Sequence, residues 1–148
     1  MRKTNSLYST SFLPLPRTNV VLMLFLDIIT LGIYEPIWYI QRRHAINKLL
    51  GSSEKIGAEP VIILILTLFQ FISGFFNRSS DVDPIGILVW IASWGISILM
   101  AFKVKKIIMA YLKSQSTESV HFSGFFTFLF RIFYLQYKIN RLHKKIVS

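Results

Sequence analysis

The sequence contains no cysteine and comparatively little charge. Only 16% of its 148 residues are charged, whereas soluble domains typically carry roughly 25%. The absence of cysteine excludes disulfides, cysteine metal ligands and thiol catalysis. Apolar residue types reach 53%, more than a chain of this size readily buries in water, because small proteins have proportionally little interior. We therefore expect part of the chain to lie in lipid, where apolar side chains need not be buried within the protein.

Acidic residues are scarce as well: 7 Asp and Glu stand against 17 Lys and Arg, for a net charge of +10. Almost all of the basic residues flank apolar runs, in the pattern that keeps membrane-protein loops in the cytoplasm. They are Arg2, Lys3, Arg17, Arg42, Arg43, Lys48, Lys55, Lys103, Lys105, Lys106, Lys113, Lys138, Arg141, Lys144 and Lys145. We therefore expect contact with membrane lipids, with anionic headgroups at a basic cytoplasmic face, and no nucleic-acid partner.

Two long runs, 60–76 and 85–102, contain no charged residue at all. Eighteen helical residues rise about 27 Å, close to the thickness of the hydrocarbon core of a bilayer. Pro60 and Pro84 suit the first turns of two helices, where a missing N–H does no harm. The connection between the runs, NRSSDVDP, is the least positive in the chain and should lie outside. The pattern predicts a central transmembrane hairpin in a multi-pass protein of the plasma or inner membrane.

Two further apolar segments, 20–40 and 122–137, are interrupted by polar and helix-breaking residues. If both crossed the membrane fully, the basic chain ends would lie outside, against the charge rule. A break in the first segment avoids this: a helix over 20–31 would enter, the chain would turn through Gly32–Glu35, and a second helix would run from Pro36 toward a stop at Gly51. In the second segment, aromatic residues around Arg131 suit the headgroup boundary. Broken or re-entrant segments are our expectation, and ordinary crossings are the alternative.

The expected fold is therefore all-α: a small polytopic membrane protein with a central hairpin flanked by two broken, re-entrant or spanning segments. Residues 1–19 form a cytoplasmic tail, and 20–148 form a single membrane domain. Apolar stripes continue beyond the segments at helical spacing and could form a small packed cap or lie on the membrane surface. They comprise Ala45, Ile46, Leu49 and Leu50, then Val104, Ile107, Ile108 and Tyr111, and finally Leu135, Ile139, Leu142 and Ile146.

A weak internal echo links the two ends of the chain. Tyr39-Ile40-Gln41 precedes Ile46-Asn47-Lys48-Leu49, and Tyr134-Leu135-Gln136 precedes Ile139-Asn140-Arg141-Leu142. The spacing within the two copies differs by two residues. A duplicated helix that leaves the membrane through aromatic and then basic residues would produce this echo, and so would any two unrelated helices that leave a membrane.

Four short stretches resemble an uncharacterised prokaryotic membrane family, domain of unknown function 4234. Ile29-Thr30-Leu31-Gly32-Ile33-Tyr34, followed by Trp38-Tyr39 and Ile46-Asn47, is similar to the hallmark of that family, and Tyr134-Leu135-Gln136-Tyr137-Lys138-Ile139-Asn140 resembles its closing element. Glu35 departs from the pattern, which would place a small or apolar residue there. The resemblance covers about a third of the chain. It implies a small polytopic membrane protein and no particular activity.

Three ionisable residues, Asp27, Glu35 and Arg131, fall inside apolar segments, where an unpaired charge costs several kcal/mol. A functional interpretation makes Asp27 or Glu35 a proton or cation site beside unwound carbonyls near Gly32. A structural interpretation pairs one carboxylate with Arg131. In a third, Glu35 lies near the surface, within reach of Arg42 or Arg43.

The small residues Ser93, Ser97 and Ala101 recur on one face of the third segment and would let another helix approach closely, either within this chain, near Ser73 and Gly74, or in a second copy. No catalytic or metal-binding motif is present, and the three histidines lack ligand spacing. We expect no enzyme, no cofactor and no metal. The expected role is a small structural or accessory subunit, alone as a homo-oligomer or in a larger membrane complex. The alternative is a minimal ion or proton pathway built on the intramembrane carboxylates.

Overall fold

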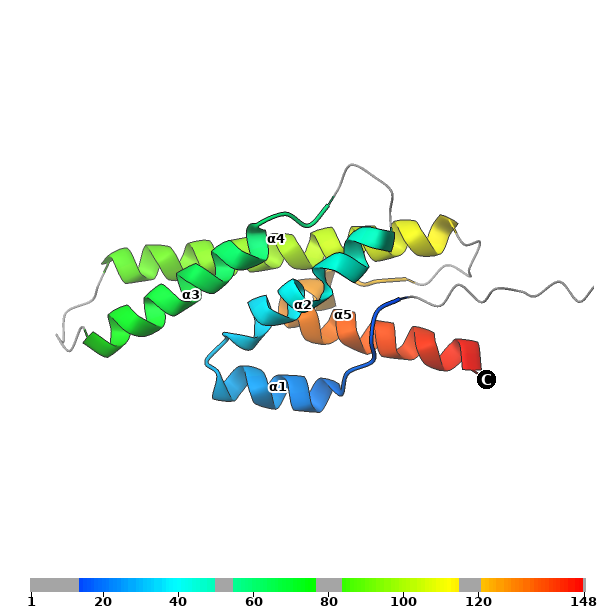
Figure 1. The fold of residues 1–148 in the computed structure, drawn as a ribbon, viewed down its shortest axis with the longest axis horizontal. Coiled ribbons are helices and arrows are strands. Elements are labelled where there is room, and N and C mark those ends of the chain that lie inside the picture. Colours follow the sequence, from blue (N-terminus) through cyan, green and yellow to red (C-terminus); the bar gives the residue numbers. More distant parts are fainter. Residues whose placement is uncertain (1–13, 50–54, 77–83, 115–120, 148) are drawn as a thin grey trace, which may run out of the picture.

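The computed structural model describes residues 14–49, 55–76, 84–114 and 121–147, and within these ranges the chain forms five helices and no strand. In chain order the helices are α1 (Val20–Ile29), α2 (Tyr34–Leu49), α3 (Glu59–Phe76), α4 (Pro84–Ser114) and α5 (Gly124–Val147), as Figure 1 shows. The expected all-α fold class is confirmed for the described residues.

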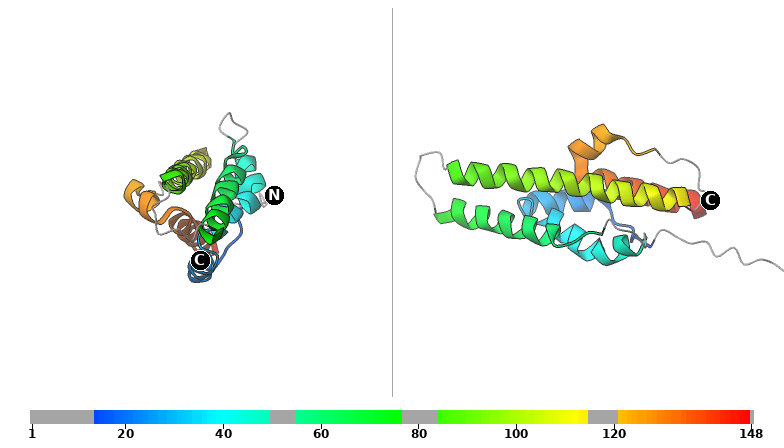
Figure 2. Two further views of the ribbon diagram at one scale, coloured as in Figure 1. Left: turned by 90° about the vertical axis from the view of Figure 1, so that its left-hand side faces the viewer. Right: turned by 90° about the horizontal axis from the view of Figure 1, so that it is seen from above.

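Helices α3 and α4 lie side by side as an antiparallel pair (Figures 1 and 2). Each begins with a proline in its first turn, which the missing N–H tolerates there. The Lys103 ammonium of α4 lies 2.6 Å from the Glu59 carboxylate, and this ion pair ties the start of α3 to the middle of α4. The predicted helices over 60–76 and 85–102 are both present, and α4 continues without a break to Ser114. The predicted outer loop at 77–83 lies outside the described residues.

The segment 20–40 is broken, as predicted, at Gly32. The Asn19 side chain caps α1 by accepting from the Val21 N–H at 2.9 Å. The chain then turns through Leu31 at φ 51° and Gly32 at φ 89°, and the left-handed conformation at Gly32 costs a glycine little. Helix α2 begins at Tyr34, two residues earlier than predicted, because the first helical turn accommodates Pro36. The expected stop at Gly51 lies outside the described residues.

Helix α5 is also broken, at Arg131, whose φ of 37° and ψ of −114° are not helical. The first arm, 124–130, is apolar and aromatic, and it points away from the second arm in the right-hand view of Figure 2. Neither glycine nor proline occurs at this break. A residue other than glycine keeps such a conformation only where its surroundings over-determine it.

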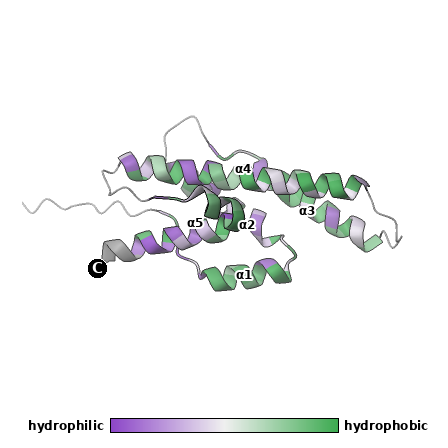
Figure 3. Ribbon diagram, turned by 180° about the vertical axis from the view of Figure 1, so that it is seen from behind, coloured by the Kyte–Doolittle hydropathy of each residue, from purple (hydrophilic) through white to green (hydrophobic). Residues whose placement is uncertain are grey.

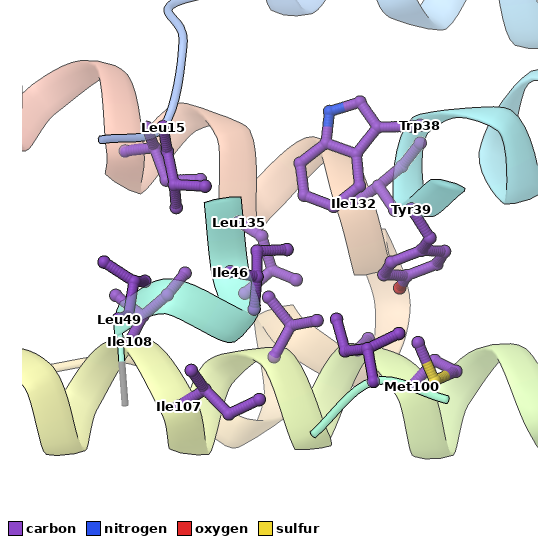
Figure 4. Packing of buried hydrophobic residues seen from close by; sticks show 14 of the residues in the cluster. Leu15, Trp38, Tyr39, Ile46, Leu49, Met100, Ile107, Ile108, Ile132 and Leu135 are labelled. Carbon is purple, nitrogen blue, oxygen red and sulfur yellow. The ribbon is translucent and has the colours of Figure 1, made fainter. Parts of the chain in front are cut away.

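Buried apolar side chains gather toward one end of the molecule, which we call the packed end. It is built from α2, the second half of α4, the second arm of α5 and the lead-in residues Leu15 and Ile56, and Figure 4 shows part of this core. The apolar stripes predicted beyond the membrane segments lie here. Their buried members are Ile46, Leu49, Val104, Ile107, Ile108, Leu135, Ile139 and Leu142. Because they fill one common core, the stripes form a packed cap.

Most of the exposed apolar side chains lie on α1, on α3, on the first half of α4 and on the first arm of α5, which we call the apolar end (Figure 3). Helices α3 and α4 are each long and apolar enough to cross a membrane. Their most apolar 18-residue windows are only 11% and 22% buried, whereas the core helix of a soluble protein would be mostly buried. These two helices therefore present apolar side chains to their surroundings.

The internal echo corresponds to a repeated interaction. The Asn47 amide donates to the Ile56 carbonyl at 3.0 Å and accepts from the Ile56 N–H at 2.8 Å. Asn140 pairs in the same way with both backbone groups of Thr18, at 2.6 and 3.3 Å. Each asparagine thus holds the backbone just ahead of an apolar helix: Ile56 leads into α3, and Thr18 leads into α1. Residues 14–19, assigned to the tail from the sequence, are packed against α5 through this contact and through buried Leu15.

Candidate functional site

The two helix breaks meet at an ion pair. Glu35 lies in the first turn of α2, directly after the first break, and Arg131 is the residue at the second break. The Arg131 Nη1 atom lies 3.0 Å from the Glu35 Oε2 atom. Glu35 is only 6% exposed. A charge this deeply buried is tolerated when a partner and hydrogen bonds satisfy it, and the ion pair therefore joins α2 to α5.

Ser97 of α4 completes this network. Its hydroxyl donates to Glu35 Oε1 and accepts a hydrogen bond from Arg131 Nη1 at 3.3 Å. Ser97 is itself buried. One hydroxyl therefore contacts both members of the ion pair, and the network ties three helices together. Buried polar networks of this kind hold their elements in one arrangement only when every member is satisfied.

Asp27 lies beside this network, in the last turn of α1. Arg131 is the cation whose field acts on its carboxylate, and the backbone N–H of Glu35 donates to that carboxylate. Its Oδ1 atom, however, is buried and has no hydrogen-bond partner. Arg131 is already engaged with Glu35 and Ser97, so Asp27 is left as an incompletely satisfied carboxylate. Buried polar atoms without a hydrogen-bond partner are uncommon in folded proteins.

Asp27 and the ion pair line a cavity of about 230 Å³ between the helices. Two of its walls come from the apolar stretches of α3 and α4. The lining residues are Asp27, Leu31, Gly32, Glu35, Ile63, Thr67, Gln70, Trp90, Ser93, Trp94, Ser97 and Arg131. The indole rings of Trp90 and Trp94 are stacked, with centroids 6.2 Å apart, and the Arg131 guanidinium lies 5.8 Å from the Trp94 ring. The cavity lining therefore combines polar and charged side chains with two tryptophan rings.

The structure brings all three of the charged candidates together, and Glu35 pairs with Arg131. The surface alternative for Glu35 is wrong, because the two arginines proposed for it have other partners. Arg42 donates to Thr18 Oγ1 and stacks on the Trp38 ring at 4.7 Å, and Arg43 donates to the Ile56 carbonyl. Burial lowers the pKa of the Arg42 guanidinium, and nearby Tyr34 raises it. A guanidinium starts from so high a pKa that it stays charged.

The small-residue face of α4 is covered within this chain. Ser93, Ser97 and Ala101 are all buried, and Ser97 makes the contact with α2 and α5 described above. The close approach suggested for α3 at Gly74 is not found, because a Cβ built there meets nothing within 4 Å. The small side chains on α4 instead leave room for the ion pair and for the cavity beside it.

Sequence reasoning did not place Gln70, Thr67 and the two tryptophans at the site. Gln70 and Thr67 interrupt the apolar run of α3 three residues apart, and this spacing puts them on one helix face. That pattern could have signalled a polar cavity. Within the part of the chain that the structure describes, no group of three or more His, Cys, Asp or Glu residues could hold a metal ion.

These features define a class of protein: an all-helical chain with an exposed apolar helical pair, two broken helices and a polar network at the breaks. The sequence matches the family described as Domain of unknown function (DUF4234) over residues 18–144, and the chain belongs to this family. The match covers α1 to α4 completely and α5 up to residue 144. Neither a curated protein nor a solved structure matches the chain.

Proposed function

We propose that this protein is an integral membrane protein in which α3 and the apolar half of α4 cross the bilayer. The observation that carries the proposal is that both helices are largely unburied along their most apolar stretches. Lipid is the solvent in which such surfaces are stable, because in water each exposed Å² of apolar surface costs about 25 cal/mol. The packed end then lies outside the hydrocarbon core of the bilayer.

In this arrangement the two broken helices enter from the side of the packed end and do not cross. Helix α1 has ten residues, and helices need about 20 residues to span a bilayer. Breaks at membrane depth are tolerated where the freed backbone groups are buried in protein or line a water-filled cavity, and here Leu31, Gly32 and Arg131 line the cavity between the helices. Most of the basic residues then lie on the cytoplasmic side, beside anionic headgroups, as the charge rule requires.

Lysine substitution tests the membrane placement. Ile65 lies near the middle of α3 and is 59% exposed. In water Ile65→Lys would be nearly neutral, whereas at the centre of a membrane helix a lysine costs about 3 kcal/mol. We expect Ile65→Lys to reduce the fraction of protein that resists alkaline extraction from membranes. Met109→Lys, on the exposed surface of α4 at the packed end, is the matched control and should leave that fraction unchanged. Release of the wild-type chain by alkaline washing would refute the proposal.

We further propose that the protein works by association, as a small structural or accessory subunit without enzymatic activity. This is supported by the polar groups of the site, because Glu35, Ser97 and Arg131 are engaged with one another and none is free to act on a substrate. The exposed apolar faces of α1 and of the first arm of α5 add surface that lipid or a second protein chain can cover.

A second candidate is an ion or proton pathway, favoured by the carboxylate of Asp27 in the lining of the cavity. Two measurements separate the candidates. An accessory subunit should co-purify stoichiometrically with a specific partner after mild detergent extraction, and its proteoliposomes should pass no current. A pathway should give a flux that Asp27→Asn abolishes without unfolding the protein. Isolation as a single species with such a flux would decide against the accessory role.

A further inference from the structure

We propose that the cavity between the two helix breaks binds a small organic ammonium ion, with its positively charged nitrogen at Asp27 and its apolar body against Trp90. This goes beyond the roles proposed above, because it assigns a ligand class to the cavity whether or not anything crosses the membrane. The charges, the hydrogen-bonding groups and the aromatic wall each contribute to the assignment.

The charges in the cavity leave one negative charge uncompensated. Arg131 is held by Glu35 at 3.0 Å and by Ser97 at 3.3 Å, so this ion pair is neutral as a unit. The carboxylate of Asp27, which also lines the cavity, is the remaining negative charge. A cationic ligand in the cavity would supply the missing positive charge beside Asp27, and charge-assisted hydrogen bonds are among the strongest that side chains make.

The neighbouring hydroxyl groups favour a ligand that donates hydrogen bonds. Thr67 donates its hydroxyl proton to the Ile63 carbonyl at 2.8 Å, and Ser93 donates its proton to the Val89 carbonyl at 2.9 Å. Because each hydroxyl has only one proton, both of these oxygens can offer only lone pairs to a ligand. Together with Asp27, they make a set of acceptors suited to the N–H groups of an ammonium ion.

The two tryptophans in the lining favour a ligand with an apolar body. Trp90 is stacked parallel to Trp94, and it is 58% exposed. Indole is the aromatic ring that attracts cations most strongly, and it also covers apolar groups well. A metal ion fits less well, because the described residues contain no cluster of three acidic, histidine or cysteine ligands. A compact amine with an aromatic or aliphatic tail matches both kinds of lining residue.

Benzylammonium is a suitable probe, and benzyl alcohol is its neutral counterpart. Binding to the full chain, purified in mild non-ionic detergent, can be followed by equilibrium dialysis against empty micelles. We expect saturable binding that Asp27→Asn weakens about tenfold, since the charge-assisted hydrogen bond at Asp27 is lost. Glu59→Gln is the matched control, because this carboxylate lies at the start of α3 and pairs with Lys103 away from the cavity. It should bind as the wild type does.

A second variant covers the case in which Asp27→Asn does not fold. Gln70→Glu adds a carboxylate at the cavity wall and should tighten benzylammonium binding severalfold. The proposal is overturned if the folded wild type shows no saturable binding, if benzyl alcohol competes as well as benzylammonium, or if sodium displaces the probe at equal concentration. Because dialysis in detergent involves neither a membrane nor a partner, failure here leaves the proposed membrane role standing. Success here with no flux in proteoliposomes would refute only the pathway.

Discussion

At the scale of single residues, two ion pairs in this protein differ chiefly in burial. The Glu35 and Arg131 side chains are 8% and 20% exposed, whereas those of Glu59 and Lys103 are 34% and 27% exposed, so the main difference is the burial of the carboxylate. Removing one partner of an enclosed pair leaves an uncompensated charge and typically costs about 3–5 kcal/mol. An exposed pair contributes less than about 1 kcal/mol, because water screens it. The two pairs therefore provide a matched comparison.

We predict that Arg131→Met lowers the free energy of unfolding by about 3 kcal/mol and that Lys103→Met lowers it by less than about 1 kcal/mol. The double variant Glu35→Leu/Arg131→Met should recover much of the loss, since no buried charge is left without a partner. Denaturant unfolding in mild detergent, followed by tryptophan fluorescence, measures all three. Equal losses for the two cation variants, or no recovery in the double variant, would contradict a structural role for the buried pair.

At the scale of elements, the break between α1 and α2 depends on one glycine with a left-handed backbone. Gly32 has φ 89°, and a Cβ built there would meet no other atom within 4 Å. A substitution is therefore disfavoured by the backbone alone and not by a clash. Gly95 has the same open surroundings, but it lies inside the helix α4. Alanine is favoured over glycine inside a helix.

We predict opposite signs for the same substitution at these two positions. Gly32→Ala should destabilise the protein by about 1–2 kcal/mol, because the left-handed conformation is sterically unfavourable for alanine. Gly95→Ala should stabilise it by about 0.5–1 kcal/mol. Thermal unfolding of the two variants in the same detergent checks both signs. Stabilisation by Gly32→Ala would mean that α1 and α2 can join into one continuous helix.

At the scale of the whole molecule, hydrophobic residues dominate α1 and the first half of α4, whereas hydrophilic residues are concentrated on the second half of α4 and the second arm of α5 (Figure 3). The proposed orientation makes a simple prediction about the two chain ends. If α3 and α4 are the only crossings, both ends lie in the cytoplasm and the connection between these helices lies outside. If α1 and α5 crossed as well, the two ends would lie outside.

Single cysteines can test this orientation without background, because the native chain has none. We expect a membrane-impermeant maleimide to label Ser80→Cys in intact cells, and to label Asn5→Cys and Val147→Cys only after the cells are permeabilised. Labelling of all three positions in intact cells would indicate four crossings. Labelling of the end positions with Ser80→Cys protected would indicate the opposite orientation.

The sequence by itself determined the helical class, the two uncharged runs, the break at Gly32 and the family. These are local properties: hydropathy over about 18 residues, helix-stop residues and short motifs can each be recognised without knowing what packs against them. The stripes at Ile107 and Leu135 were recognisable for the same reason, since apolar residues at helical spacing must be covered by something.

Only the tertiary structure decided which charges meet. Pairing Glu35 with Arg131, and not with Arg42, depends on how α2, α4 and α5 pack, and no local pattern encodes that arrangement. The break at Arg131 also has no glycine or proline to signal it in the sequence. The surrounding contacts impose this backbone conformation, which arginine does not favour by itself. The cavity at Asp27 depends on the helix packing and on the break at Arg131, since it exists only where the two breaks and the small side chains of α4 come together.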